Sequence, residues 1–398
     1  AGYTIYYMGI NIGAGAAPLV GMFIAQSPSF RNTISGWGMD PNMVWKIAFA
    51  VPAIGMVFGL LQYFAGYKKL GDAGLHPTIP TDKVKAARDV SVLKVMVAGF
   101  VLLIGGGVLI DHFVYELSKE LIGNVFGVGL LIAAIAVFVG FFKTARDHGE
   151  RSRVAAMIPL FIGAIAFFAL FEQASTTMTL YTERLVDRQL LGFYVPASFY
   201  QFWNAIFIVI LATPFAAMWL RLGKAGREPS SVNKFGIGMV FAALSFCVML
   251  PSLTDANTSS WLLFLNAPAE SSGIVSPYYL IAFYFVSTLS ELFISPVGLS
   301  SMNALAPARL AGMVMGTWFL ATAIGNYIAG RAASISEGNG YGYLFKLLII
   351  SALIIAAALF LVAPRIKRMM AGKNPSEPMD RTEKTEPEPL PTAKTVDD

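Results

Sequence analysis

The stretch RVAAMIPLFIGAIAFFALFEQASTTMTLYTER (residues 153–184) is apolar over most of its length, yet it carries Glu172 near its middle. A helix needs about 20 mostly apolar residues to cross the hydrocarbon core of a bilayer, and this stretch is long enough. A charged side chain at the bilayer centre costs about 2.5–3.5 kcal/mol on insertion scales. The stretch therefore predicts a membrane helix whose carboxyl group serves a purpose other than packing.

The whole chain has the composition of this stretch. Of its 398 residues, 56% are hydrophobic and 13% are charged, and the mean hydropathy is +0.63. Soluble domains carry about 25% charged residues, so the bilayer is the expected solvent. The apolar runs are too long and too numerous for a β-barrel, and they predict an all-α membrane protein. Ten helices are expected, at 3–25, 43–67, 91–113, 121–142, 153–183, 197–220, 233–253, 277–303, 309–332 and 343–363.

Basic residues alternate between the loops that separate these helices. The loops after the second, fourth, sixth, eighth and tenth helices hold about three times as many Lys and Arg residues as the other loops. Basic loops stay in the cytoplasm, and we therefore expect both ends of this chain to be cytoplasmic. Residues 371–398 are charged, rich in Pro and poor in large apolar groups, which predicts a disordered cytoplasmic tail.

Several function classes lack support in the sequence. The net charge of +5 is explained by the basic loops, and there is no basic stripe with interleaved aromatic residues that would indicate nucleic-acid binding. Cys247, the single cysteine, lies in an apolar run and is expected to pack there. There is no Walker A motif, and the three His residues lack the spacing of metal ligands. We expect no metal, no cofactor and no enzymatic activity.

Two carboxylates, Glu172 and Glu291, lie near the centres of predicted helices, and no Lys or Arg lies at comparable depth. Each must be protonated, face a water-filled cavity, or pair with a group outside this chain. Burial disfavours the charged form of a carboxyl group, whereas a nearby cation favours it. A carboxyl group held between these influences can load and release a proton.

Other polar residues share helix faces with the two carboxylates. Such residues often only bond to the backbone or hold helices together, but their alignment with glutamates favours a cavity. The prolines inside the helices weaken single turns, and Pro296, close after Glu291, is a candidate hinge. The aligned sets are Glu172, Ser175, Thr176, Thr179 and Glu183; Tyr284, Ser287, Thr288, Glu291 and Ser295; Gln201 and Asn204; Tyr3, Tyr7 and Asn11; and Trp318, Thr322 and Asn326.

Five stretches resemble helices of the proton-dependent oligopeptide transporter (POT) family, within the major facilitator superfamily. The stretch FFALFEQASTTM (167–178), with its Phe-Glu-Gln signature, is similar to the seventh helix of the family. The other stretches are GYTIYYMGINIGAGAAPLVG (2–21), SFYQFWNAIFIVILATPFAA (198–217), LSELFISPVGLSSMNALAP (289–307) and GMVMGTWFLATAIGNYIAG (312–330), which resemble the fifth, eighth, tenth and eleventh helices. The resemblance covers nearly the whole chain except the tail.

The resemblance implies a partial major facilitator bundle. Residues 1–67 would be the last two helices of the N-terminal bundle, and 68–150 a cytoplasmic linker with two extra membrane helices. Residues 151–370 would form the C-terminal six-helix bundle. We expect the chain to be a fragment without the family's first four helices, one of which carries a Lys that pairs with the seventh-helix carboxylate.

The resemblance also implies roles for individual residues. Glu172 would be the proton-linked carboxylate, and Glu291 would bind the amino terminus of a peptide, with Asn204 beside it. Asn11 would hydrogen-bond the peptide towards its carboxyl side. Trp318 would form an aromatic wall of the cavity, and Ser295, one turn from Glu291, is a weaker candidate for peptide binding.

The sequence thus leads to the hypothesis of a proton-coupled symporter of di- and tripeptides in a bacterial inner membrane, working by alternating access. Its partners would be the peptide, protons and the lipid bilayer. Two alternatives stay open: a facilitator of another small solute such as nitrate, and a truncated membrane protein that does not transport and acts as a scaffold. A membrane enzyme ranks below both, since no catalytic constellation occurs.

Overall fold

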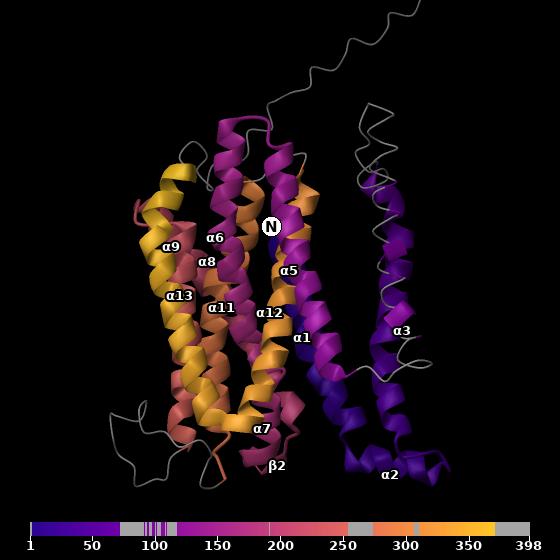
Figure 1. Ribbon diagram of the computed structural model, residues 1–398. Helices are drawn as coiled ribbons and strands as arrows, with labels where there is room; N and C mark the ends of the chain where they lie inside the picture. Colours follow the sequence, from indigo (N-terminus) through magenta and orange to yellow (C-terminus); the bar gives the residue numbers. More distant parts are fainter. Residues whose placement is uncertain are drawn as a thin grey trace, which may run out of the picture. The chain divides into compact units, whose positions relative to one another are not determined.

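The computed structural model describes residues 2–71, 118–190, 192–253, 274–305 and 310–370, together with residues 91, 94, 98–99, 101, 105–107 and 109. These residues are almost entirely helical (Figure 1). The chain divides into two compact units, one made of residues 1–18 and 133–398 and the other of residues 19–132.

The first unit holds most of the helices. Short 3₁₀ turns at Glu172–Ala174, Ala197–Gln201 and Leu250–Leu253 extend three of the helices. A two-stranded hairpin, β1 (Gln189–Leu190) and β2 (Phe193–Tyr194), follows α7. The helices are α1 (Gly2–Val20), the second half of α5 (Lys119–Thr144), α6 (His148–Phe171), α7 (Thr177–Leu185), α8 (Phe202–Lys224), α9 (Ser231–Met249), α11 (Tyr278–Leu305), α12 (Ala311–Asn339) and α13 (Tyr341–Met370).

The predicted all-α membrane architecture is confirmed. Seven helices among the described residues are long and apolar enough to cross a membrane, and a bent pair, Gly9–Ala25 and Pro28–Gly36, meets the same condition together. α12 covers the predicted helix at 309–332 but is less apolar than these seven. The predicted helix at 91–113 lies mostly outside the described residues, as does the tail at 371–398.

The second unit contains α2 (Pro28–Gly36) and α3 (Met43–Gly66), and α2 is capped by the Ser27 side chain, which accepts from the Phe30 N–H at 3.3 Å. α3 leaves most of its hydrophobic side chains exposed within the described structure. Such a helix, hydrophobic on all sides, is expected of a chain that has lipid as its solvent.

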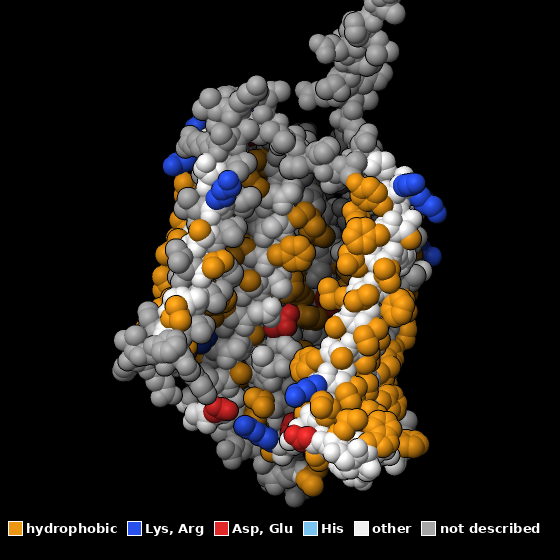
Figure 2. All heavy atoms as spheres, turned by 90° about the vertical axis from the view of Figure 1, so that its right-hand side faces the viewer, with side chains coloured by type: hydrophobic (Ala, Val, Ile, Leu, Met, Phe, Trp, Pro, Cys, Tyr) orange, Lys and Arg blue, Asp and Glu red, His pale blue; other side chains and the backbone are white. Residues whose placement is uncertain are grey.

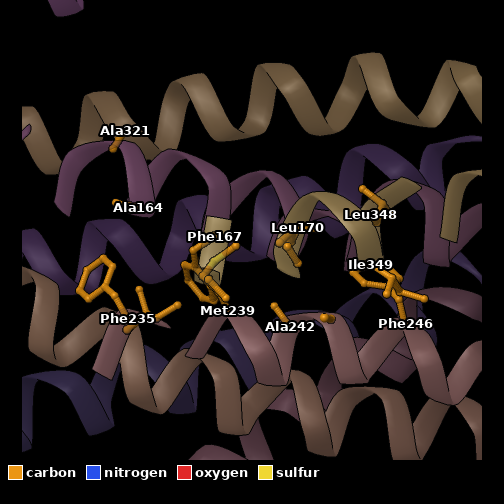
Figure 3. Packing of buried hydrophobic residues seen from close by; sticks show 14 of the residues in the cluster. Ala164, Phe167, Leu170, Phe235, Met239, Ala242, Phe246, Ala321, Leu348 and Ile349 are labelled. Carbon is orange, nitrogen blue, oxygen red and sulfur yellow. The ribbon is translucent and has the colours of Figure 1, made fainter. Parts of the chain in front are cut away.

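The core of the first unit forms around α9, which packs most extensively against α11 and α13, while α6 packs against α12. Figure 3 shows Phe167 and Leu170 of α6 near Met239 of α9 in the interior. Leu348 and Ile349 of α13 lie farther along α9, near Phe246. Within α9 only Leu244 is exposed, so this helix is enclosed on nearly all sides, as expected of a helix at the centre of a bundle.

Glycines allow two of these helix pairs to approach closely. A β-carbon at Gly238 of α9 would collide with the side chain of Ile294 on α11. A β-carbon at Gly325 of α12 would lie 2.9 Å from the backbone nitrogen of Ala169 on α6. Membrane helices associate through close van der Waals packing of this kind, because lipid offers them no hydrophobic driving force.

Buried hydroxyl groups join α9 to α11 at two levels. Ser290 Oγ donates to the Gly238 carbonyl at 2.8 Å, and Ser301 Oγ donates to Ser231 Oγ at 2.7 Å. Interhelical bonds between Ser or Thr groups contribute about 1 kcal/mol in membranes. Cys247, the single cysteine of the chain, is partly buried farther along α9, and the packing role expected for it fits its contact with the core cluster.

Several basic groups lie near helix ends, such as Arg221 and Lys224 of α8 and Lys367 and Arg368 of α13, whereas Glu291 lies in the middle of α11. On the face shown in Figure 2, hydrophobic side chains cover the middle of the helices, and Lys and Arg side chains lie towards their ends. Lys234, near the start of α9, is buried, forms an ion pair with Glu228, and lies 4.1 Å from the ring centroid of Trp219 on α8. By contrast, the ion pair between Arg184 and Glu337, with 3.6 Å between nitrogen and oxygen, is half exposed.

Candidate functional site

The span that runs from His148 to Leu185 breaks at Glu172. α6 ends at Phe171, a 3₁₀ turn covers Glu172–Ala174, and α7 begins at Thr177. Sequence analysis predicted one membrane helix at 153–183, and the span His148–Leu185 agrees with it. The sequence did not predict the 3₁₀ turn that interrupts its α-helical hydrogen bonding. The residues of the stripe instead bond to the turn: Ser175 Oγ and Thr176 Oγ1 each donate to the Glu172 carbonyl at 3.0 Å.

The carboxylate of Glu172 is half buried, and it shares the single hydroxyl proton of Ser175 with the Glu172 carbonyl, with 3.0 Å between Oγ and Oε2. This contact is local, because both residues belong to the same turn. A change in the charge of Glu172 therefore acts directly on the hydroxyl of Ser175, whereas Thr176 contacts only the backbone carbonyl.

Gln173 holds the other side of this turn and was not singled out by sequence analysis. Its side chain is fully buried. Nε2 donates to the Ala169 carbonyl at 2.9 Å and to the Ala329 carbonyl of α12 at 3.5 Å, while Oε1 accepts from Thr177 at 2.5 Å. A buried amide needs hydrogen-bond partners. A Gln next to Glu172 within an apolar run could therefore have predicted that Gln173 bonds to neighbouring backbone groups.

The turn is tied to α11 and α8 as well. Tyr284 of α11 donates its hydroxyl to the Ala174 carbonyl at 3.4 Å, and Thr179 Oγ1 donates to the same oxygen at 3.1 Å. Gln201, just before α8, donates to Thr179 Oγ1 at 3.4 Å. Helices that are distant in sequence thus meet at one backbone carbonyl of the broken span.

The second glutamate lies in a polar cluster between α8 and α11. Asn204 Nδ2 donates to Glu291 Oε2 and to Thr288 Oγ1, both at 3.0 Å. Thr288 is fully buried and donates to the carbonyl of Tyr284 at 2.7 Å. A path of contacts therefore leads from the Glu172 turn through Tyr284 and Thr288 to Asn204 and Glu291. The structure brings together Asn204 and Glu291, as the resemblance implied.

Two other expected site residues lie around these clusters. Ser295, one turn beyond Glu291, is half buried on α11. α11 runs unbroken through Pro296, so the break in this region is at Glu172 and not at the proline. Trp318 is only 7% exposed, lies edge-on to Phe168 with 5.7 Å between ring centroids, and covers Gly298.

Asn11, the last of the expected residues, is buried at 6% exposure on α1. α1 approaches α8 at Gly15, where a β-carbon would lie 3.2 Å from Cβ of Ala205. Asn11 therefore lies one turn before the point where its helix meets the helix that carries Asn204. The side chains of Tyr3 and Tyr7, predicted to share the face of Asn11, lie outside the described residues.

No group of three or more His, Cys, Asp or Glu residues within the described part of the chain could hold a metal ion. The polar groups that do cluster are carboxylates, amides and hydroxyls on helices that are long enough to cross the membrane. They can hold a cation or an ammonium group and exchange a proton, and they are contributed by several helices.

Comparison with known proteins agrees with this architecture. The profile described as "POT family" matches residues 1–341. The chain is 32% identical to "Uncharacterized transporter YclF" of Bacillus subtilis, covering 94% of this chain and 68% of that protein. It is 31% identical to "Peptide transporter YePEPT" of Yersinia enterocolitica, over 93% and 68% of the two chains.

Solved structures agree as well. A crystal structure of "peptide transporter POT in complex with sulfate" matches with a TM-score of 0.69 at 34% identity, covering 94% of this chain and 69% of that one. A POT family transporter solved "in complex with 5-aminolevulinic acid" matches with a TM-score of 0.73 at 28% identity, covering 92% and 69%. The chain belongs to the POT family of membrane transporters.

Proposed function

We propose that the protein carries di- and tripeptides across the bacterial inner membrane by proton-coupled symport with alternating access. Relatives named as di-/tripeptide transporters, such as one of Lactococcus lactis at 29% identity, support this substrate class. The observation that carries the proposal within this chain is the contact between Asn204 and Glu291, 3.0 Å apart on two membrane helices. A carboxylate at such depth is costly, so a cationic ligand is the expected complement.

Peptide recognition follows from the chemistry of a zwitterion. The ammonium group of a free peptide has three N–H donors and no acceptor, and Glu291 with Asn204 offers a charge and an amide oxygen to match it. Asn11 would bond to the peptide towards its carboxyl side. Trp318 would bound the space for peptide side chains, and Ser295 would add a hydroxyl one turn from Glu291.

Proton coupling is assigned to Glu172. Protonation removes its negative charge, which weakens the bond from Ser175 and any attraction to a cation that faces the carboxylate. The helix break would then loosen and permit the change between outward-open and inward-open states. Deprotonation towards the cytoplasm would restore the starting state.

The topology and the domain plan are parts of the same proposal. Both ends of this chain would be cytoplasmic, with 1–67 as the end of the N-terminal bundle, 68–150 as linker and extra helices, and 151–370 as the C-terminal bundle. Reporter fusions at residues 226 and 270 test this arrangement, because they would lie on opposite sides of the membrane. Fusions that report the same side would contradict it.

The decisive test of function is uptake by proteoliposomes that contain the purified protein. With an inward proton gradient, labelled Ala-Ala should accumulate above its external concentration and be recovered intact, since transport without chemical conversion is proposed. Dissipation of the gradient by a protonophore should stop accumulation. Absence of gradient-driven uptake of any di- or tripeptide would refute the proposal.

A second candidate, a facilitator of another solute, is tested in parallel because a similar transporter was solved in complex with 5-aminolevulinic acid. That compound carries an amino group and a carboxyl group, as a dipeptide does. Competition of Ala-Ala, free alanine, 5-aminolevulinic acid and nitrate against labelled dipeptide ranks these ligands. Stronger competition by nitrate than by Ala-Ala would favour the alternative.

A further inference from the structure

Thr288 contacts the side-chain amide of Asn204, with 3.0 Å between Oγ1 and Nδ2. It is fully buried on α11, one turn before Glu291. Its hydroxyl proton is donated to the Tyr284 carbonyl, 2.7 Å away. A threonine hydroxyl has a single proton, so it can present only a lone pair to Asn204.

Asn204 therefore turns its nitrogen towards α11. Nδ2 lies 3.0 Å from Thr288 Oγ1 and 3.0 Å from Glu291 Oε2, and these two acceptors use both of its protons. A flipped amide would set its oxygen against a lone pair of Thr288 and against the carboxylate of Glu291. Both contacts would be repulsive, so the observed orientation is the stable one, and Oδ1 points away from both acceptors.

We propose that Thr288 is a positioning residue for the amino terminus of the cargo, an inference that rests on the proposed function. By fixing the Asn204 amide, Thr288 orients the amide oxygen of Asn204 as an acceptor beside the carboxylate of Glu291, so that both can accept from one ammonium group. A flipped amide would present N–H donors to a ligand that itself has only donors. Preference for a free amino terminus thus depends on a residue that does not touch the cargo.

Substitution of Thr288 tests this through the ratio of two affinities. In proteoliposomes, Ala-Ala and N-acetyl-Ala-Ala compete against labelled Ala-Ala, and each inhibition constant is measured. Thr288→Val keeps the shape of the side chain but removes the acceptor for the Asn204 amide. The affinity for Ala-Ala should fall by about five- to tenfold, the equivalent of about one hydrogen bond. Binding of N-acetyl-Ala-Ala should not change, and Thr288→Ser should restore the ratio of the wild type.

Two further variants separate positioning from packing. Thr182 is buried at 1% exposure and donates to the Met178 carbonyl at 2.6 Å, as Thr288 does to Tyr284, so Thr182→Val is the matched control and should leave the ratio unchanged. In an Asn204→Ala background, Thr288→Val should have no further effect, because Thr288 acts through Asn204. If Thr288→Val does not fold, Thr288→Ala removes the same acceptor.

The outcomes distinguish the two proposals. Absence of gradient-driven uptake of Ala-Ala would overturn the proposed function. A wild-type protein that transports Ala-Ala with no preference for a free amino terminus would overturn the assignment of Glu291 and Asn204 to the ammonium group, and this inference with it. A wild-type protein with that preference, combined with an unchanged ratio in Thr288→Val, would overturn this inference alone. Independent, multiplying effects of Thr288→Val and Asn204→Ala would also overturn it.

Discussion

The hydroxyl of Tyr284 donates to the carbonyl of Ala174, 3.4 Å away, and so holds the turn that carries Glu172 against the helix that carries Glu291. Thr179 bonds to the same carbonyl at 3.1 Å. The two glutamates are therefore linked by hydrogen bonds together with the covalent structure of Tyr284 and of the turn at Glu172–Ala174. If the turn moves when Glu172 is protonated, the contact between Ala174 and Tyr284 would transmit this movement to α11, which carries the proposed ammonium site.

Glu172→Gln should abolish proton-driven accumulation of Ala-Ala and leave exchange of peptide across the membrane, because glutamine keeps the shape and the hydrogen-bonding capacity but cannot gain a proton. Uptake under a proton gradient and counterflow without one are the two measurements. Glu183→Gln is the control, since Glu183 lies in the same span with a side chain that is 61% exposed. Uphill uptake at the wild-type rate in Glu172→Gln would refute the assignment.

Glu291→Gln should raise the KM for Ala-Ala on the order of 10- to 100-fold, because a charge-assisted bond to the ammonium group contributes about 1.5–3 kcal/mol. The loss should be much smaller for N-acetyl-Ala-Ala, which has no ammonium group. Initial rates of uptake over a range of peptide concentrations give both values. Equal losses for the two peptides would show that Glu291 serves the fold and not the amino terminus.

Gly325→Ala should lower stability by about 1–3 kcal/mol, the usual cost of overpacking, because the new methyl group would meet Phe168 and the backbone of Ala169. Gly330→Ala on the same helix is the matched control, since a β-carbon there meets nothing within 4 Å. Thermal unfolding of both variants in detergent gives the comparison. A variant at Gly325 as stable as the one at Gly330 would contradict the close packing of α6 on α12.

Glu228→Gln should destabilise the protein by about 1–3 kcal/mol, because it leaves the buried ammonium group of Lys234 without its charged partner. The cost stays below that of a fully buried pair, since the Glu228 side chain is 35% exposed. Glu337→Gln, which breaks the exposed pair with Arg184, should cost less than about 1 kcal/mol. Melting temperatures of the two variants in the same detergent test this order of stability losses. A larger loss in Glu337→Gln than in Glu228→Gln would contradict it.

Sequence reasoning reached the helices because apolar runs of membrane length have few other uses in a chain of this composition. It also identified Glu172 and Glu291 as candidate functional residues, because the free-energy cost of a carboxylate in a membrane helix can be inferred from the sequence alone. The pairing of Asn204 with Glu291 came from the resemblance to the family. The spacing of residues along one helix does not predict which side chains of another helix they will contact.

The break at Glu172 could not be read from the sequence. No Pro or Gly lies between Phe167 and Arg184, and these are the residues by which a helix end is normally recognised. The turn is stabilised by hydroxyl groups that bond to the Glu172 carbonyl and by Gln173, which reaches Ala329 on α12. Conversely, Pro296 is the residue at which a break is expected, yet α11 runs unbroken through it.

The lone thiol at Cys247, partly buried in α9, makes this chain convenient for spectroscopy. One replacement, for instance Cys247→Ser or Cys247→Ala, removes every native sulfhydryl of the sequence. Pairs of spin labels or fluorophores can then be installed at exposed positions such as Phe193 and Leu361, which are 75% and 82% exposed. The transport cycle of this protein is thereby open to direct distance measurement in the lipid bilayer.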